Sequence, residues 1–353
     1  MMRTISLSAL CCIFLTGILA SCTPDDPPPI VIGGDGPVQD TTLISVTELP
    51  SLRIPEDNPL TVAGVDLGRH LFYDKIMSGD QSMACATCHH QEKAFSDGLR
   101  VSAGIHGDSG TRNAMVIFNL MWTDSLFWDS RAGTLRQLAT MPIENPVEMD
   151  ARVPDVLQRL NASAMYRKKF YDAFQTDTIL EVHLSKALEQ FLLTITSDNS
   201  KFDKFNRGEL QLTPSEARGF EILKVKGCFN CHSTSLMHDN ISHNTGLDKF
   251  PQDQGLGDFT HNSKDDFKFK TPSLRNIMVT SPYMHDGRFR TIEEVIHFYE
   301  SDVQFTSRNI TADLMQIAPR NKLTTQDMTD VKAFLNALTD ENLLTNKKFS
   351  DPF

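Results

Sequence analysis

The chain is poor in positive charge and in long apolar runs. Of its 353 residues, 34 are Lys or Arg and 45 are Asp or Glu, which gives a formal net charge of -11. Nucleic-acid binding calls for a basic surface, so this balance argues against a nucleic-acid partner. Beyond the N-terminal segment no apolar stretch is long enough to cross a bilayer. We therefore expect no membrane-spanning helix in the mature chain.

Cysteine is also scarce, and the assignment of all 7 residues leaves none for a disulfide. A basic start and an apolar run over residues 5–20 predict a secretory signal at residues 1–21, which would remove Cys11 and Cys12. The small residues before Cys22 resemble a bacterial lipobox, so Cys22 would carry lipid and anchor a periplasmic protein to the membrane. An ordinary signal peptide cut nearby is the alternative. Residues 22–45, rich in Pro, Gly and Asp, predict a flexible tether.

The remaining four cysteines form two C-x-x-C-H motifs, the attachment signature of haem c. In such a motif both cysteines bind the haem as thioethers and the histidine ligates the iron. A zinc ribbon is the alternative, but its two C-x-x-C pairs are spaced about 15–20 residues apart. The sequence therefore predicts two covalently attached haem c groups, at Cys85, Cys88 and His89 and at Cys228, Cys231 and His232.

Helix signals dominate the rest of the chain and predict an all-α fold. Capping boxes begin at Thr213 and Thr324, each followed by apolar residues at helical spacing. Residues 154–205 also look helical, whereas residues 233–270 are polar and Gly-rich and predict loops. We expect two cytochrome c-like domains, at residues 46–205 and 206–345, each with one haem in its core.

The sixth ligand of each iron decides whether it transfers electrons or binds peroxide. A third capping box at Thr291 opens a helix through Glu300, and Tyr299 lies on its apolar face. Tyr299 could ligate the second iron or pack in the core. The rival ligands are Met278, Met284 and Met315, whereas His297 lies on another face.

Three residues are candidates near the first haem. Glu148 could move protons during O–O cleavage or could be a solvated loop residue. Trp128 could relay electrons between the haems or could be an ordinary buried tryptophan. His106 could be a distal ligand or a loop histidine.

These segments resemble the bacterial di-haem cytochrome c peroxidase family, which includes MauG. The resemblance spans about residues 50–340 and rests on the runs at 67–74, 94–98, 111–113, 127–129, 142–149, 271–276 and 281–287. It implies that the His89 haem reacts with peroxide and the His232 haem receives electrons from an external donor. Trp128 then matches the inter-haem tryptophan, and Glu148 matches the distal acid.

The resemblance also implies a calcium ion between the haems, held by Asn113 and by backbone carbonyls near Thr280 and Pro282. Hard oxygen ligands of this kind suit calcium. Tyr299 falls where the peroxidases carry an axial Met and where MauG carries a Tyr ligand. A phenolate favours Fe(III), so the enzyme could react with peroxide while fully oxidised.

Three positions depart from the family pattern. Leu138 stands where the family has a distal glutamine, with Gln137 adjacent. The distal histidine of reductively activated peroxidases aligns with Ile105, one residue before His106. Lys226 stands where MauG has a surface tryptophan, which argues against oxidation of a docked protein by that route.

Taken together, the sequence predicts a periplasmic, lipid-anchored peroxidase that reduces hydrogen peroxide to water. Its electrons would come from a small cytochrome c or cupredoxin, and the family suggests a homodimer. One alternative is a MauG-like oxidase that acts on a protein or organic substrate through high-valent haem states. Another is a di-haem electron carrier without peroxidase activity.

Overall fold

Helices begin where the capping signals of the sequence predict them. The computed structural model describes residues 40, 43–44, 49–233, 235–317 and 322–353, apart from the side chains of 315–317. The signal segment, Cys22 and most of the tether therefore lie outside the described residues. Thr213, Thr291 and Thr324 each accept a hydrogen bond from the backbone N–H three residues on, and each helix starts at the next residue.

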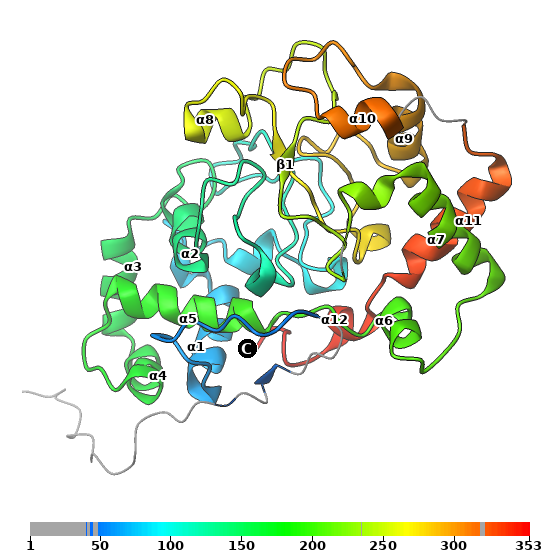
Figure 1. The fold of residues 1–353 in the computed structure, drawn as a ribbon. Coiled ribbons are helices and arrows are strands. Elements are labelled where there is room, and N and C mark those ends of the chain that lie inside the picture. Colours follow the sequence, from blue (N-terminus) through cyan, green and yellow to red (C-terminus); the bar gives the residue numbers. More distant parts are fainter. Residues whose placement is uncertain (1–39, 41–42, 45–48, 234, 318–321) are drawn as a thin grey trace, which may run out of the picture. The chain divides into compact units, whose positions relative to one another are not determined.

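Helices and loops make up nearly all of the described chain (Figure 1). The α-helices are α1 (Val62–Tyr73), α2 (Leu135–Glu144), α3 (Val153–Ala162), α4 (Ala164–Phe174), α5 (Glu181–Thr194), α6 (Lys201–Asn206), α7 (Pro214–Lys226), α8 (Leu256–Thr260), α9 (Ile292–His297), α10 (Ala312–Ile317), α11 (Thr325–Ala337) and α12 (Glu341–Thr345). The strands β1 (Ser242–His243) and β2 (Phe269–Lys270) form one short antiparallel pair. The mostly helical fold predicted from the sequence is confirmed, and no described helix is long and apolar enough to cross a bilayer.

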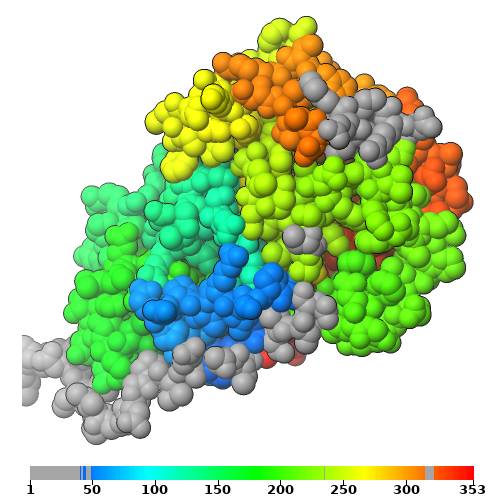
Figure 2. Space-filling model, viewed as in Figure 1, coloured from blue at the N-terminus to red at the C-terminus, as the bar shows by residue number. Residues whose placement is uncertain are grey.

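The larger hydrophobic core is built on α1 and α5, which lie side by side (Figure 1). Leu67, Leu71 and Phe191 are completely buried there, because the apolar faces of both helices turn inward. The described chain begins along the surface of this core, in blue in Figure 2, where the indole N–H of Trp122 donates to the Pro50 carbonyl at 3.0 Å.

The smaller core is built on α7 and α11, which also lie side by side (Figure 1). The backbones approach closely at Gly219, where an added Cβ would lie 2.0 Å from the Asp330 carbonyl oxygen. Phe334 is fully buried against this contact. Helix α7 is capped by Gly227, whose positive φ of 82° turns the chain directly into the second C-x-x-C-H motif.

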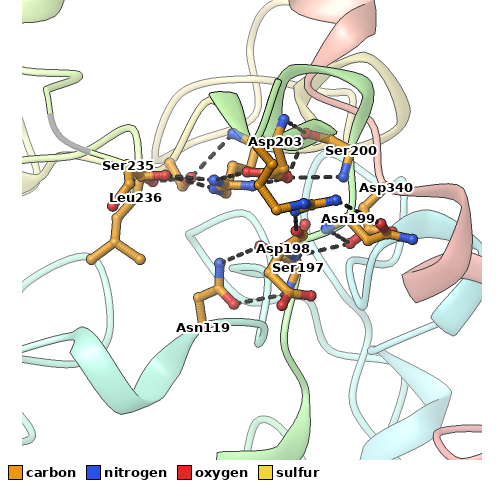
Figure 3. A network of polar contacts seen from close by, with 12 residues as sticks. Asn119, Ser197, Asp198, Asn199, Ser200, Asp203, Ser235, Leu236 and Asp340 are labelled. Carbon is orange, nitrogen blue, oxygen red and sulfur yellow. Dashed lines mark hydrogen bonds and ion pairs between the residues drawn. The ribbon is translucent and has the colours of Figure 1, made fainter. Parts of the chain in front are cut away.

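A polar hub of buried groups connects the segments that join the two cores (Figure 3). Asp203 on α6 forms a completely buried ion pair with Arg275, at 2.6 Å. One carboxylate oxygen of Asp340, before α12, accepts the backbone N–H groups of Asp198 and Asn199 at 3.0 Å. The chain then returns to the larger core, where Leu343 and Phe349 are buried. The hub therefore fixes the linker between the cores against the C-terminal segment.

Candidate functional site

A cavity of about 510 Å³ is lined by both C-x-x-C-H motifs. The motifs lie 143 residues apart in sequence, counted from Cys85 to Cys228, yet all six of their cysteine and histidine residues face this one space. Its walls are mostly apolar, and Trp128, Glu148, Lys270 and Tyr299 also line it. The structure therefore brings together the residues that the sequence assigns to two haem sites.

Each motif histidine is held in one orientation by a backbone carbonyl. His89 Nδ1 lies 2.8 Å from the Phe95 carbonyl oxygen, and His232 Nδ1 lies 3.1 Å from the Pro272 carbonyl oxygen. A carbonyl only accepts hydrogen bonds, so Nδ1 carries the proton in each ring and Nε2 keeps its lone pair. Burial lowers the pKa of both histidines, which keeps them neutral as iron ligands.

None of the four motif cysteines forms a disulfide in the structure. The first cysteine of each motif opens a short 3₁₀ turn, Cys85–Thr87 and Cys228–Asn230. Burial raises the pKa of Cys85 to about 12, so it is neither a reactive thiolate nor a ready metal ligand. Half-buried thiols that form no disulfide and lie beside an oriented histidine fit the thioether attachment of haem c.

Trp128 is held rigidly at the wall of the cavity. Its side chain is buried, and its indole N–H donates to the Asn113 carbonyl at 2.9 Å. Its own carbonyl accepts the backbone N–H of Lys270 at 2.8 Å, two residues before the Pro272 carbonyl that orients His232. Trp128 is thus fixed beside the second motif, which suits the inter-haem role that the family resemblance implies for it.

Glu148 is a half-buried carboxyl group that lines the cavity near the first motif. Asn145 Nδ2 donates to its Oε1 at 2.7 Å, and its backbone carbonyl accepts the Ile105 N–H at 3.0 Å. Burial raises the pKa of Glu148, although the Asn145 hydrogen bond and the charge of Arg131 oppose this effect. A raised pKa moves a carboxyl group toward the range where it can both accept and donate a proton at neutral pH.

Tyr299 lines the cavity from a π-helical turn, Phe298–Asp302, that follows α9. The helix that the sequence predicts from Thr291 through Glu300 is confirmed, although its α-helical geometry ends at His297 and it continues as the π-helical turn. Within the part of the chain that the structure describes, the Tyr299 hydroxyl has no hydrogen-bond partner. Burial, and then the nearby cysteines Cys228 and Cys231, raise its pKa. The Tyr299 phenol therefore lies near the second motif without a hydrogen-bond partner among the described residues.

The methionines suggested as rival ligands differ in position. Met284 lines the cavity and packs with Tyr299 against Phe298. Met278 packs instead against the smaller core and is not part of the cavity lining. The side chain of Met315 lies outside the described residues. Met284 is therefore the rival to Tyr299 that the described geometry retains.

The residues expected to hold calcium also line the cavity, namely Asn113, Thr280 and Pro282. The Asn113 amide donates to the Leu99 carbonyl at 2.8 Å, while its Oδ1 accepts no hydrogen bond from a described residue. The Thr280 hydroxyl donates to the Ile277 carbonyl at 3.3 Å. Amide and backbone carbonyl oxygens are among the ligands that calcium takes.

Two candidates for the distal side of the first haem lie outside the cavity. His106 is exposed and its Nε2 lies 2.7 Å from Asp150 Oδ2. It does not line the cavity, so the interpretation of His106 as a distal ligand is wrong, and His106 is a loop histidine. Gln137 is exposed and its Oε1 accepts the Gly133 N–H at 2.9 Å. The neighbouring Leu138 lines the cavity instead. This distal wall is therefore more apolar than a glutamine would make it.

Sequence reasoning missed two charged groups at the cavity. Lys270 is buried there, with an exposed fraction of 7%. His243 bonds to Asp239 Oδ2 at 2.7 Å, and this contact raises its pKa to about 9. Ligand atoms of Cys231, Asp239 and His243 lie within 4.8 Å of one another, but the C-x-x-C-H motif already assigns Cys231 to haem. No local sequence signal marks these residues, because their significance comes from burial.

A family model and two related proteins assign this chain to the same family. A family model described as di-haem cytochrome c peroxidase matches residues 62–211. The methylamine utilization protein MauG of Methylophilus methylotrophus is 32% identical over 292 residues, which cover 82% of this chain and 86% of that protein. The cytochrome-c peroxidase IdrP1 of Pseudomonas sp. (strain SCT) is 30% identical, with 82% and 84% covered. The chain belongs to the di-haem cytochrome c peroxidase family.

A solved structure supports the same conclusion. A MauG-like protein associated with microbial copper homeostasis has a TM-score of 0.81 and 35% identity, covering 86% of this chain and 97% of that one. The di-haem peroxidase BthA from Burkholderia thailandensis E264, at 21% identity and a TM-score of 0.73, shares the fold. Membership of a di-haem family implies haem c cofactors. Within this family, the peroxidase and the MauG protein are about equally similar to this chain, at 30% and 32% identity.

Proposed function

We propose that the chain is a periplasmic oxidoreductase that carries two covalent haem c groups and reduces hydrogen peroxide to water. The single observation that carries this proposal is the shared cavity, in which both C-x-x-C-H motifs, Trp128, Glu148 and Tyr299 meet. When bound, the haems would supply the redox chemistry and carry two electrons to the peroxide. A small cytochrome c or cupredoxin would deliver these electrons at the His232 site, and they would pass Trp128 to the His89 site.

Glu148 would move the protons of the reaction. Its carboxylate accepts the proton from one peroxide oxygen and returns it to the other, so that the O–O bond breaks and water leaves. Two electrons and two protons from outside complete the conversion of hydrogen peroxide to two waters. Asn145 holds the carboxyl group in place through its 2.7 Å hydrogen bond. The apolar side chain of Leu138 offers no competing hydrogen bond at this wall.

Tyr299 would ligate the second iron. Its hydroxyl has no partner among the described residues, and a phenolate there favours Fe(III) over Fe(II). The second haem would then be difficult to keep in its Fe(II) state. The first site would react with peroxide while both haems are ferric. In this respect the enzyme would differ from peroxidases that react only after one of their two haems has been reduced.

A MauG-like oxidase is the second candidate function. Tyr299 favours it, as does the 32% identity to a MauG protein. Lys226 disfavours oxidation of a docked protein along the MauG route, because lysine cannot relay an electron as tryptophan can. Under this alternative the same peroxide reaction would draw its electrons from a protein or organic substrate.

The first experiment mixes hydrogen peroxide with the fully ferric protein and with a half-reduced sample in a stopped-flow absorption spectrometer. We expect the ferric protein to react, and the Tyr299→Phe variant to lose the low-spin signal of the second haem. The matched control is Tyr283→Phe, since the Tyr283 hydroxyl is already bonded to the Ile277 carbonyl at 3.0 Å.

Three results would contradict parts of the proposal. Reaction only after half-reduction, with an unchanged low-spin spectrum in Tyr299→Phe, would show that Tyr299 is not the ligand and would leave Met284 as the rival that lines the cavity. Two low-spin irons without peroxide turnover would indicate an electron carrier. Consumption of peroxide without donor oxidation, but with oxidation of an added organic substrate, would favour the MauG-like candidate.

A lipid anchor, a calcium ion and a homodimer complete the proposal. Lipidation of Cys22 would anchor the chain to a membrane, and Asn113 with the Thr280 and Pro282 carbonyls would bind calcium between the haems. Membrane fractionation of a Cys22→Ala variant and metal analysis of the purified protein test these two points. Sedimentation analysis tests the expected homodimer.

A further inference from the structure

Lys270 is a buried cation that contacts no carboxylate among the residues that the structure describes. It lies on β2, has an exposed fraction of 7% and lines the cavity between the two motifs. Its Nζ has no hydrogen bond and no ion pair within the described parts of the chain. Asp124 attracts it only from a distance, and Asp124 is already paired with Arg53 at 2.8 Å.

The arginines that line the same cavity are neutralised by the protein. Arg112 forms ion pairs with Asp129 and, at 2.7 Å, with Asp253. Arg131 also contacts Asp129, at 2.9 Å. Lys270 differs from both arginines, because no described carboxylate compensates it. An unpaired buried ammonium group is strongly unfavourable, which indicates that an anion from outside the chain completes this site.

The position of Lys270 is fixed by its backbone. It pairs with Ser242 of β1, and its N–H donates to the Trp128 carbonyl at 2.8 Å. Two residues later the Pro272 carbonyl orients His232. The ammonium group therefore extends from a short segment that is anchored to both the inter-haem tryptophan and the second motif.

We propose that Lys270 is the counter-ion of a propionate carboxylate of one of the two haems bound in this cavity. Each haem carries two propionates, which are the anions that accompany haem attachment. The neighbouring His238 does not compete for this role, because burial and then Lys270 lower its pKa to about 4 and keep it neutral. This inference rests on covalent haem attachment but is independent of the peroxide reaction, so either can fail without the other.

The pairing has a consequence for the reduction potential of that haem. With Lys270 present the propionate remains ionised, and the pair adds no net charge at any pH near neutrality. Without the cation a buried carboxyl group has a raised pKa and takes up a proton as the pH falls. The haem would then carry an extra negative charge at high pH only, and a negative charge favours Fe(III).

The test measures haem reduction potentials between pH 5 and 9 in the haem-loaded protein. We expect pH-independent potentials in the wild type. In Lys270→Met we expect one potential to fall as pH rises, reaching at least a tenfold change in the reduction equilibrium, or about 59 mV. Lys270→Arg should restore the flat profile. The matched control is Lys268→Met, since Lys268 lies on the same segment, pairs with Asp265 at 3.2 Å and does not line the cavity.

If both reduction potentials of Lys270→Met are independent of pH, and the variant carries its full haem content, the proposal is overturned. If that variant does not retain haem, a crystal structure of the haem-loaded wild type decides the question. The proposal requires Lys270 Nζ within hydrogen-bond distance of a propionate oxygen, and a propionate bound only to other groups would refute it.

Discussion

At the scale of single residues, Glu148 gives the sharpest prediction. Replacing it by Gln keeps the side-chain volume but removes the proton acceptor, so we expect the peroxide reaction to slow by about 10²–10⁴-fold. Because burial raises the pKa of Glu148, the wild-type rate should rise with pH as this carboxyl group ionises, whereas Glu148→Gln should lack this dependence. Stopped-flow rates across a pH series check both points.

The control for this prediction is Glu144→Gln. Glu144 is the exposed last residue of α2 and lies four residues before Glu148 without lining the cavity. Its replacement should leave the rate and the pH profile unchanged. A Glu148→Gln variant as fast as the wild type would show that another group moves the proton.

The roles of functional residues were predictable from the sequence where the chemistry depends on a few neighbouring positions. A covalent haem needs its cysteines and histidine within five positions, so the spacing alone assigns them. Tyr299 was predictable in part, because helical periodicity puts it on one face with Ile292 and Ile296, and all three line the cavity. Lys270 was not predictable, because only the fold reveals that it is buried without a carboxylate.

At the scale of secondary-structure elements, the starts of helices were predictable and one helix end was not. The capping boxes at Thr213, Thr291 and Thr324 are local hydrogen-bond patterns and define the first residues of α7, α9 and α11. The π-helical turn after His297 depends on how Phe298 and Val303 pack, which no local pattern specifies. Turns of this kind often occur at functional sites, and this one carries Tyr299.

The contact between α7 and α11 provides a prediction for these elements. Helix propensity alone favours Ala over Gly by about 1 kcal/mol, yet a Cβ at Gly219 would lie 2.0 Å from the Asp330 carbonyl oxygen. We therefore expect Gly219→Ala to destabilise the protein by about 1–3 kcal/mol, as overpacking does. Thermal unfolding followed by circular dichroism measures this change.

Gly133→Ala is the comparison for that experiment. The nearest neighbour of a Cβ there would be Gln137 Oε1 at 3.8 Å, and φ does not require glycine. That variant should match the wild type or exceed it slightly, because Ala restricts the unfolded chain. Equal stability of Gly219→Ala and the wild type would mean that the two helices separate at little cost.

At the scale of the whole molecule, the polar hub joins segments that are far apart in sequence. Asn276 Nδ2 donates to Ser197 Oγ at 2.9 Å, and the Asp340 N–H donates to Asn276 Oδ1 at 2.8 Å. These pairs are 79 and 64 residues apart, so neither helix periodicity nor capping patterns could predict them. The return of the C-terminal segment to the larger core, through Leu343, was unpredictable for the same reason.

The hub makes stability depend on pH through Asp198. Burial, and then the charges of Asp340 and Asp203, raise the pKa of Asp198 to about 6, although Arg275 and Arg207 oppose the shift. In the unfolded chain this pKa is about 3.9. Between these two values the folded state binds more protons, so the contribution of Asp198 to stability falls as pH rises from about 4 to 6.

Asp198→Asn removes this titration and should raise the free energy of unfolding at pH 7.5 by about 1 kcal/mol, after allowance for partial solvent screening. The gain should disappear near pH 4, where Asp198 is protonated in the folded protein. Thermal unfolding at both pH values measures the difference. Asp177→Asn is the control, because Asp177 is exposed and forms no ion pair within the described residues. A gain in Asp198→Asn that is equal at pH 4 and 7.5 would assign the effect to packing, because only relief of a buried charge follows the titration of the carboxyl group.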